Sequence, residues 1–411
     1  MKVKEFIKKF DTHADYEVFK ASEDYVTPNV SKCVAEDELH YNKAEVNAAL
    51  TAKYVVAEGS EDTRIYYPYN RNVSKIEVDG VEIPFSAISE DEGTYPLPAG
   101  EHTIKYTLID PTTTGYFIGC DMTEVILPKT LTEIHALAFR QAFNLTKVNI
   151  PTGVTEIGWS AFTFTNLDNV VIPESVTTIH HNAFAYCENL KSINIPSGVT
   201  ELESYVFYEC KKLEELNIPS GVTSIGVRAF AGCQLLTHIE IPTGVTVIND
   251  MVFEGCKGIT GVTLHSGITS IGKHAFHASG IVSVGGVGSG KALELPSSIT
   301  KIPYGMFEMC YDLKEAIIPE GITEIEINGF VLATGLTTVV LPSTLEKIGM
   351  DAFQMAGSPN ITINATVPPQ LYNAEVFKNT NAKFYVPAES LEAYKTAEYW
   401  STYASKIYAQ S

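Results

Sequence analysis

The feature that most constrains the fold of this chain is a repeat of about 23 residues, which starts near Leu108 and continues almost to the C-terminus. Two successive copies are INIPSGVTELESYVFYECKKLEE from Ile193 and LNIPSGVTSIGVRAFAGCQLLTH from Leu216. A phenylalanine recurs at steps of 22 to 24 residues, with one step of 31, at Phe117, Phe139, Phe162, Phe184, Phe207, Phe230, Phe253, Phe276, Phe307, Phe330, Phe353 and Phe377. A proline column keeps the same register, with His265 in one of its ten places. These columns predict a solenoid of about ten 23-residue coils.

Each part of the repeat has a physical role. The Val-x-Ile segment, as at Val148 and Ile150, alternates inward and outward, which predicts a short half-buried strand. Proline lacks a backbone donor, so it ends each strand and opens a turn. The Val-x-x-Ile and Ala-Phe segments then return the chain through the core, with phenylalanine as the largest buried group. A single coil cannot bury its own apolar face, so we expect neighbouring coils to stack and both ends to be capped.

The Pro-x-Gly-Val-Thr and Ala-Phe-x-x-Cys elements resemble the BspA-type leucine-rich repeats that are abundant in gut bacteria, over roughly Leu108 to Ile407. The resemblance implies a leucine-rich repeat solenoid, mostly β with short helical or 3-10 turns. It also implies a surface or secreted protein of gut bacteria that acts in cell adhesion, by binding a protein or glycan of the host or of other bacteria.

Four regions follow from these patterns. Residues 1–43 are predicted to form a helical attachment segment, and residues 44–107 a small antiparallel β module that caps the array, with Asp79 and Gly80 at a hairpin turn. Together they make a small α+β cap. The repeats occupy residues 108–386. Residues 387–411 resemble the capping helix of such arrays, and the aromatic side chains expected to cover the last coil are Tyr394, Tyr399, Trp400, Tyr403 and Tyr408.

An alternative function rests on the N-terminal region. The stretch TPNVSKCVAEDELHYN, from Thr27 to Asn42, and the β module resemble the N-terminal regions of gut bacterial and bacteriophage proteins that carry the same repeats. That resemblance implies a bacteriophage structural protein, a virion fibre or decoration protein that docks through residues 1–43.

Charge and hydropathy limit the partners. The formal net charge of −20 disfavours nucleic acid and anionic membranes, because phosphate binding needs clustered Lys and Arg. We see no apolar run long enough to span a bilayer, so membrane insertion is not expected. The first twenty residues lack the unbroken apolar stretch of a signal peptide. Surface location would then require a trimmed leader or another export route, such as a virus particle.

Two motifs suggest chemistry and are better explained by structure. Six cysteines stand three residues after a repeat phenylalanine, where other copies carry Ala, Ser or Thr, so they are predicted to be buried free thiols. The segment GGVGSGK, from Gly285 to Lys291, has the spacing of a phosphate-binding loop, but Ala292 replaces the Ser or Thr that would hold magnesium. It coincides with the extra residues of the 31-residue step, so we interpret it as an insertion between coils.

No catalytic, cofactor-binding or metal-binding residues are predicted. The pairs His180 with His181 and His274 with His277 are four coils apart, with no carboxylates at matching positions, and they are interpreted as surface or turn histidines. We recognise no nucleophile elbow, catalytic triad or paired-carboxylate motif. We therefore expect a protein that is not an enzyme, with a hydrolase that uses an unrecognised site as the weaker alternative.

The best candidate for a binding site is a departure from the repeat. Positions that flank the phenylalanine vary between copies, which is expected if they face solvent. In three successive coils they carry an aromatic patch, a group of residues that often marks an interaction surface. The patch consists of Trp159, Phe164, His181, Tyr186, Tyr205 and Tyr208. The alternative is that these rings only pack between coils.

Overall fold

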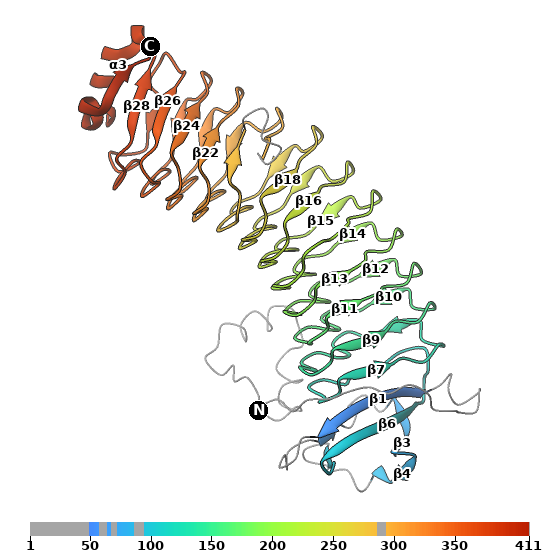
Figure 1. Cartoon of the computed structure of the whole chain (residues 1–411). Coiled ribbons are helices and arrows are strands. Elements are labelled where there is room, and N and C mark those ends of the chain that lie inside the picture. The colour runs from blue at the N-terminus through green and yellow to red at the C-terminus, as the bar shows by residue number, and fades with distance from the viewer. Residues whose placement is uncertain (1–48, 57–63, 67–71, 86–93, 286–292, 411) are drawn as a thin grey trace.

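The computed structural model describes residues 49–56, 64–66, 72–85, 94–285 and 293–410. Its coils stack in one elongated, curved row (Figure 1). The sheet that contains β1 (Ala49–Val56) and β6 (Gly100–Leu108) lies at one end, and α3 (Leu391–Thr396) lies at the other. The predicted helical attachment segment 1–43, on which the virion alternative depends, lies outside the described residues, as does Cys33. The predicted leucine-rich repeat solenoid is confirmed.

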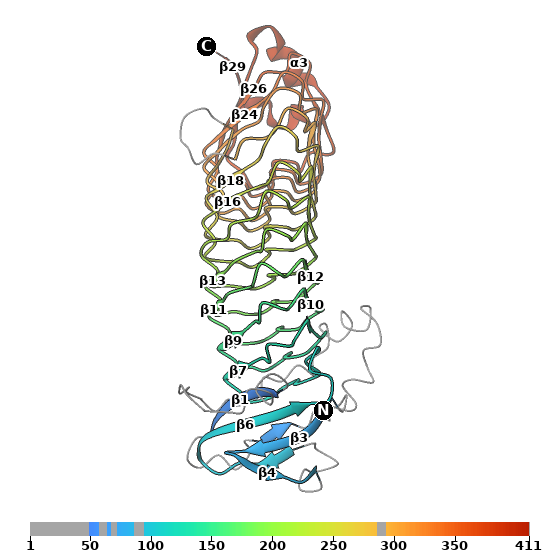
Figure 2. The same cartoon turned by 90° about the vertical axis from the view of Figure 1, so that its right-hand side faces the viewer.

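The Val-x-Ile segments form one side of the solenoid. Several of these segments pair in parallel with the equivalent segment of the next coil, as Val339 does with Ile361. Figure 2 shows this file of strands along one edge of the array. Its members are β7 (Glu124–Ile126), β9 (Lys147–Asn149), β11 (Asn169–Val170), β13 (Ser192–Ile193), β16 (His238–Glu240), β18 (Gly261–Thr263), β20 (Ser283–Val284), β22 (Glu315–Ile317), β24 (Thr338–Leu341), β26 (Asn360–Ile363) and β28 (Lys383–Val386).

A second file of parallel strands follows the proline turn, where the sequence predicted only a return through the core. In β10, Ile157 pairs with Ile134 on one side and Ile179 on the other, and all three isoleucines are buried. The Thr-x-Ile part of the repeat thus alternates out and in like a strand. This file contains β8 (Glu133–Ile134), β10 (Glu156–Ile157), β12 (Thr178–Ile179), β14 (Glu201–Leu202), β15 (Ser224–Ile225), β17 (Val247–Ile248), β19 (Ser270–Ile271), β21 (Lys301–Ile302), β23 (Glu324–Ile325), β25 (Lys347–Ile348) and β27 (Gln370–Leu371).

The third side consists of turns around the repeat phenylalanines, and we call it the turn file. The backbone N–H of Phe162 donates to the carbonyl of Ala183 in the next coil at 2.8 Å, and that of Phe184 donates to Val206 at 3.1 Å. The phenylalanine rings are buried and stack on one another with centroids 5.0 to 6.0 Å apart. This ladder gives about twelve coils rather than ten, because the first and last coils keep the phenylalanine but lose the proline column.

The cysteine column lies beside this ladder. All six of its cysteines are buried free thiols, as predicted. The structure adds a reason for cysteine beyond its small size. The Sγ of Cys210 donates to the carbonyl oxygen of Phe184 at 3.2 Å, and Cys187, Cys233, Cys256 and Cys310 make the same contact to the phenylalanine of the preceding coil. The thiol thus satisfies a buried carbonyl between coils.

An antiparallel sheet covers the first coil. It contains β1 (Ala49–Val56), β3 (Val73–Val78), β4 (Val81–Ile83) and β6 (Gly100–Leu108), and β1 pairs with β7 of the array. The β3–β4 hairpin turns at Asp79 and Gly80, both with positive φ, as a type I′ turn requires. A separate pair, β2 (Arg64–Tyr66) and β5 (Thr94–Pro96), is also antiparallel. The pairing of β1 with β7 covers the edge of the array's first strand.

The other end is closed by helical turns and one more strand. The helical part is short, with η2 (Ala388–Ser390), α3 (Leu391–Thr396) and η3 (Trp400–Lys406), and the chain then adds β29 (Ile407–Ala409) in parallel with β28. Tyr394 and Trp400 are buried and donate to the carbonyls of Ala365 and Pro369 at 2.7 and 2.8 Å. Tyr403 is partly buried against the same core. Two of the rings expected to cover the last coil are exposed instead, Tyr399 and Tyr408.

The described residues on the two sides of the insertion are hydrogen-bonded to each other. Residues 286–292, which hold most of the GGVGSGK segment, lie outside the described residues. On either side of them, the backbone N–H of Gly285 donates to the carbonyl of Leu293 at 2.9 Å. The ladder continues past this step, since the rings of Phe276 and Phe307 have centroids 6.0 Å apart. The extra residues therefore leave the stacking of the coils intact.

Candidate functional site

The residues that flank the ladder phenylalanines have an unusual backbone. From Phe117 to Phe353, the residues two positions before and two positions after each phenylalanine have positive φ. Left-handed backbone costs a non-glycine residue about 1–2 kcal/mol, so it needs compensation from the surrounding structure. The hydrogen bonds between neighbouring turns supply it. In the aromatic patch these positions are occupied by Phe164 (φ 63°), Tyr186 (φ 58°) and Tyr205 (φ 61°).

All six residues of the aromatic patch lie in the turn file, at four different positions relative to the phenylalanine. Trp159 and His181 stand three residues before it, and Tyr205 two residues before it. Tyr208 follows it directly, and Phe164 and Tyr186 stand two residues after it. Every one of the six is half-buried, so the structure brings them together on one side of neighbouring coils.

The patch rings contact one another across coil boundaries. Phe164 and Tyr186 stack with centroids 4.3 Å apart, and Tyr186 meets Tyr208 edge-on at 5.1 Å. Within one coil, Tyr205 meets Tyr208 in the same way at 5.5 Å. Across a coil boundary, Trp159 lies 5.6 Å from the ring of His181. These are the contacts that the packing alternative predicted. Each of these residues also keeps part of its surface exposed.

The sequence did not identify two neighbours that extend the patch. Phe143 lies 6.5 Å from Phe164, and the guanidinium carbon of Arg228 lies 6.0 Å above the ring of Tyr205. A guanidinium over an aromatic face is a favourable cation–π contact. Arg228 could have been found by aligning the copies, because it stands two residues before Phe230, where the previous coil carries Tyr205.

Carboxylates surround the first histidine pair, contrary to the expectation that none stand at matching positions. His180 hydrogen-bonds through its two ring nitrogens to Glu156 at 2.7 Å and to Glu203 at 2.9 Å. Glu203 also accepts from the backbone N–H of His181 at 2.8 Å. Burial opposes protonation of His180, but the two carboxylates outweigh it and raise its pKa. The carboxylates were missed because they come from the coils before and after, 24 and 23 residues away.

The second histidine pair also has carboxylates nearby. Glu254 and Glu308 each follow a ladder phenylalanine directly, which is the position that His277 holds in the coil between them. This column therefore reads Glu, His, Glu over three successive coils. His274 Nδ1 lies 3.6 Å from Glu308 Oε2, and His277 Nδ1 lies 3.6 Å from Glu254 Oε1. Aligned by this column, the copies of the repeat would have predicted the group.

Comparison with known families gives a match over most of the repeats. The model described as "BspA type Leucine rich repeat region (6 copies)" matches residues 112–236, 225–362 and 286–397. The chain belongs to the BspA-type leucine-rich repeat family. Comparison with curated proteins gives no significant match. Among the described residues of this BspA-type chain, no helix is long and apolar enough to cross a membrane.

Solved structures of bacterial leucine-rich repeat proteins are similar to this BspA-type chain. A leucine-rich repeat protein from Bacteroides ovatus is 21% identical, with a TM-score of 0.50, covering 86% of this chain and 100% of its own. This likeness supports the fold. The pneumococcal vaccine antigen PcpA is 16% identical, with a TM-score of 0.45 and coverages of 70% and 77%. A leucine rich cell surface protein from Faecalibacterium prausnitzii is 27% identical, with a TM-score of 0.38 and coverages of 59% and 79%.

Proposed function

We propose that this BspA-type protein is a non-catalytic binding protein, located at the cell surface or secreted, which recognises a protein or glycan partner through its aromatic patch. The observation that carries the proposal is the gathering of six half-buried aromatic and histidine side chains on the turn file of neighbouring coils. Family membership supports a binding role, because solenoids offer long regular surfaces to partners.

The chemistry of the patch favours a protein partner. Tyr, Trp and Arg are the residues most enriched at the centres of protein interfaces, and Trp159, Tyr186, Tyr205, Tyr208 and Arg228 lie in or beside this patch. Rings already fixed by contacts between coils lose little conformational entropy when a partner binds. The net charge of −20 favours a partner with a neutral or basic surface, and recognition of a glycan is the alternative outcome.

The test is binding of the full chain to immobilised extracellular-matrix proteins and to a glycan array, repeated with Trp159→Ala and Tyr186→Ala. Loss of a central aromatic side chain typically weakens an interface by more than about tenfold, so we expect each substitution to reduce affinity by at least that factor. Matched controls are Tyr311→Ala and Tyr372→Ala, which remove tyrosines that are 52% and 61% exposed on other coils.

The outcomes are distinguishable if the variants keep the melting temperature of the parent chain. Loss of binding in the patch variants with unchanged binding in both controls supports the proposal. Equal losses in patch and control variants, unchanged binding in the patch variants, or no binding to either class of probe would refute it.

A further inference from the structure

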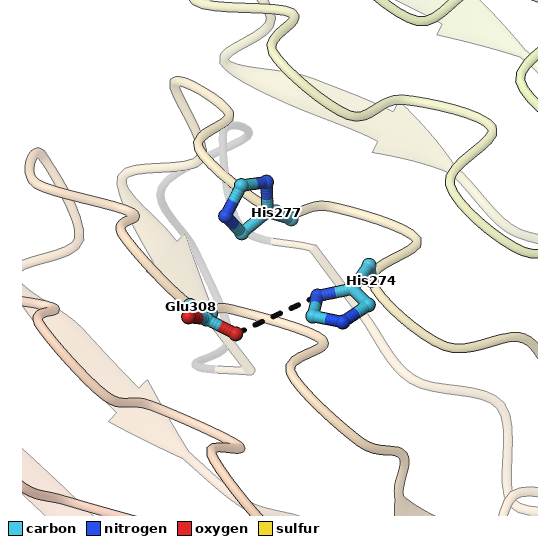
Figure 3. A group of neighbouring side chains, drawn as sticks. All are labelled: His274, His277 and Glu308. Carbon is cyan, nitrogen blue, oxygen red and sulfur yellow. Dashed lines mark ion pairs between the residues drawn. The ribbon is translucent and has the colours of Figure 1, made fainter. Parts of the chain in front are cut away.

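The second histidine pair forms a compact group of metal-binding side chains, separate from the aromatic patch. His274 and His277 lie on either side of Phe276, and Glu308 follows Phe307 in the next coil. Figure 3 shows Glu308 and His274 facing each other, with His277 beside them. One ligand atom from each of the three residues lies within 4.8 Å of the other two. The group thus bridges the two coils between which the insertion occurs.

One nitrogen of each imidazole makes no hydrogen bond to any residue that the structure describes. Within the described part of the chain, Nδ1 of His274 and Nδ1 of His277 have no hydrogen-bond partner, and both atoms are buried from solvent. The nearest carboxylate oxygens are 3.6 Å away, which is beyond hydrogen-bonding distance. Buried polar atoms are usually satisfied, so two such nitrogens close together are suited to bind an ion. The side chains of His274, His277 and Glu308 are 20%, 21% and 15% exposed, so the group is shielded but reachable.

The charge around the group suits a cation. Glu308 lies on one side of the histidines and Glu254 on the other, while Arg228 contributes one positive charge through its 3.0 Å contact with Glu254. With neutral imidazoles, these side chains carry a net charge of −1. A bound dication would therefore be attracted by the carboxylates on both sides of the histidines.

Gly305 makes room for the group. It stands two residues before Phe307, and a Cβ there would lie 2.4 Å from Cε1 and Nδ1 of His274. Its φ of +58° does not explain the choice of glycine, because Arg228, Met251, Asn328 and Asp351 adopt similar φ values at the same position of other coils. What distinguishes this coil is the imidazole that occupies the space.

We propose that His274, His277 and Glu308 together bind one divalent transition-metal ion, Zn²⁺ being the best match to two imidazoles and one carboxylate. Zinc bonds to such ligands are about 2.0–2.2 Å long, which places tetrahedral donor atoms about 3.3–3.6 Å apart. The His274–Glu308 separation of 3.6 Å is already close to this value, and side-chain rotations would bring in His277. The ion would tie the Phe276 and Phe307 coils together, and water would complete its coordination.

The test is a calorimetric titration of the full chain with ZnCl₂ after treatment with a chelator. We expect one ion per chain and a rise in melting temperature on binding. The double variant His274→Ala/His277→Ala should weaken affinity at least 100-fold, and Glu308→Gln, which keeps the size of the side chain, at least tenfold. The matched control is His180→Ala/His181→Ala, which removes the other histidine pair and should leave Zn²⁺ affinity unchanged.

A spectroscopic measurement keeps the proposal testable if the alanine variants fold poorly. Co²⁺ in place of Zn²⁺ should give the absorption bands of a four- or five-coordinate nitrogen and oxygen site, lost in Glu308→Gln. The proposal is overturned by absence of binding at millimolar ZnCl₂. It is equally overturned by binding that persists in the His274→Ala/His277→Ala variant, or by equal losses in the His180→Ala/His181→Ala control.

Discussion

The phenylalanine ladder predicts that a substitution in one coil affects the stability contribution of the adjacent coils only. Phe230 is fully buried and stacks on Phe207 with centroids 6.0 Å apart and on Phe253 at 5.8 Å. Each aromatic pair contributes about 0.5–1.5 kcal/mol beyond the area that it buries. Replacing Phe230 with leucine removes two such pairs, so we expect a loss of about 1–3 kcal/mol before any cost of unfilled volume.

A double-mutant cycle separates the ring contacts from the volume. Combining Phe207→Leu with Phe230→Leu removes the same pair twice, so the two losses should deviate from additivity by about 0.5–1.5 kcal/mol. Phe207→Leu with Phe253→Leu is the matched control, because Phe230 lies between these two rings. The losses in this second cycle should add within about 0.5 kcal/mol.

The assay is equilibrium unfolding in urea, fitted to a model in which each coil interacts only with its neighbours, since long repeat arrays depart from two-state behaviour. Equal coupling in the two cycles, or strict additivity for the adjacent pair, would refute the idea that stability is passed only between neighbouring coils.

Two further predictions concern His180 and Cys187, whose pKa values are shifted by their neighbours and by burial. Glu156 and Glu203 raise the pKa of His180 above its usual 6.5. The contribution of protonated His180 to the free energy of unfolding is therefore complete below pH 6.5 and is lost as the pH rises through the folded-state pKa. The free energy of unfolding should thus fall over this window in the parent chain and fall less in His180→Gln; the same slope in both would contradict the assignment. Burial raises the pKa of Cys187 to about 12, so a thiol reagent at pH near 8, read out by peptide mass spectrometry, should label it only after unfolding. Native labelling of Cys187 at the rate of a free thiol would show that the coils open locally.

The ladder could be predicted from the sequence because its signal repeats. Every coil has a large apolar residue in the same column, as at Phe184 and Phe207, and such a column indicates a core shared by all coils. The cysteine column was predicted from the small residues that replace it, and its hydrogen bond to a carbonyl of the preceding coil was not, because backbone partners leave no trace in composition. The ten places of the proline column underestimated the number of coils for a related reason, since end coils change residues that contact a cap.

The candidate site was less predictable because it depends on pairs of coils. His180 and Glu203 are 23 residues apart in the sequence and hydrogen-bonded in space. Such partners are missed when each copy of the repeat is considered alone, and they are found when the copies are aligned and compared position by position. The positions of the aromatic patch were predicted in this way, from the variation that flanks each phenylalanine. Whether these six residues bind a partner stays a prediction.

The left-handed turn positions have a consequence for how such proteins can diversify. Glycine, arginine, methionine, histidine, asparagine and tyrosine all occupy these places in one chain without altering the path of the backbone. Substitutions at these positions can therefore change the exposed surface of one coil, and whole coils can be added or lost, while the buried core that keeps the molecule folded stays the same. The residues that can change recognition and the residues that maintain the fold thus occupy different positions of the same repeat.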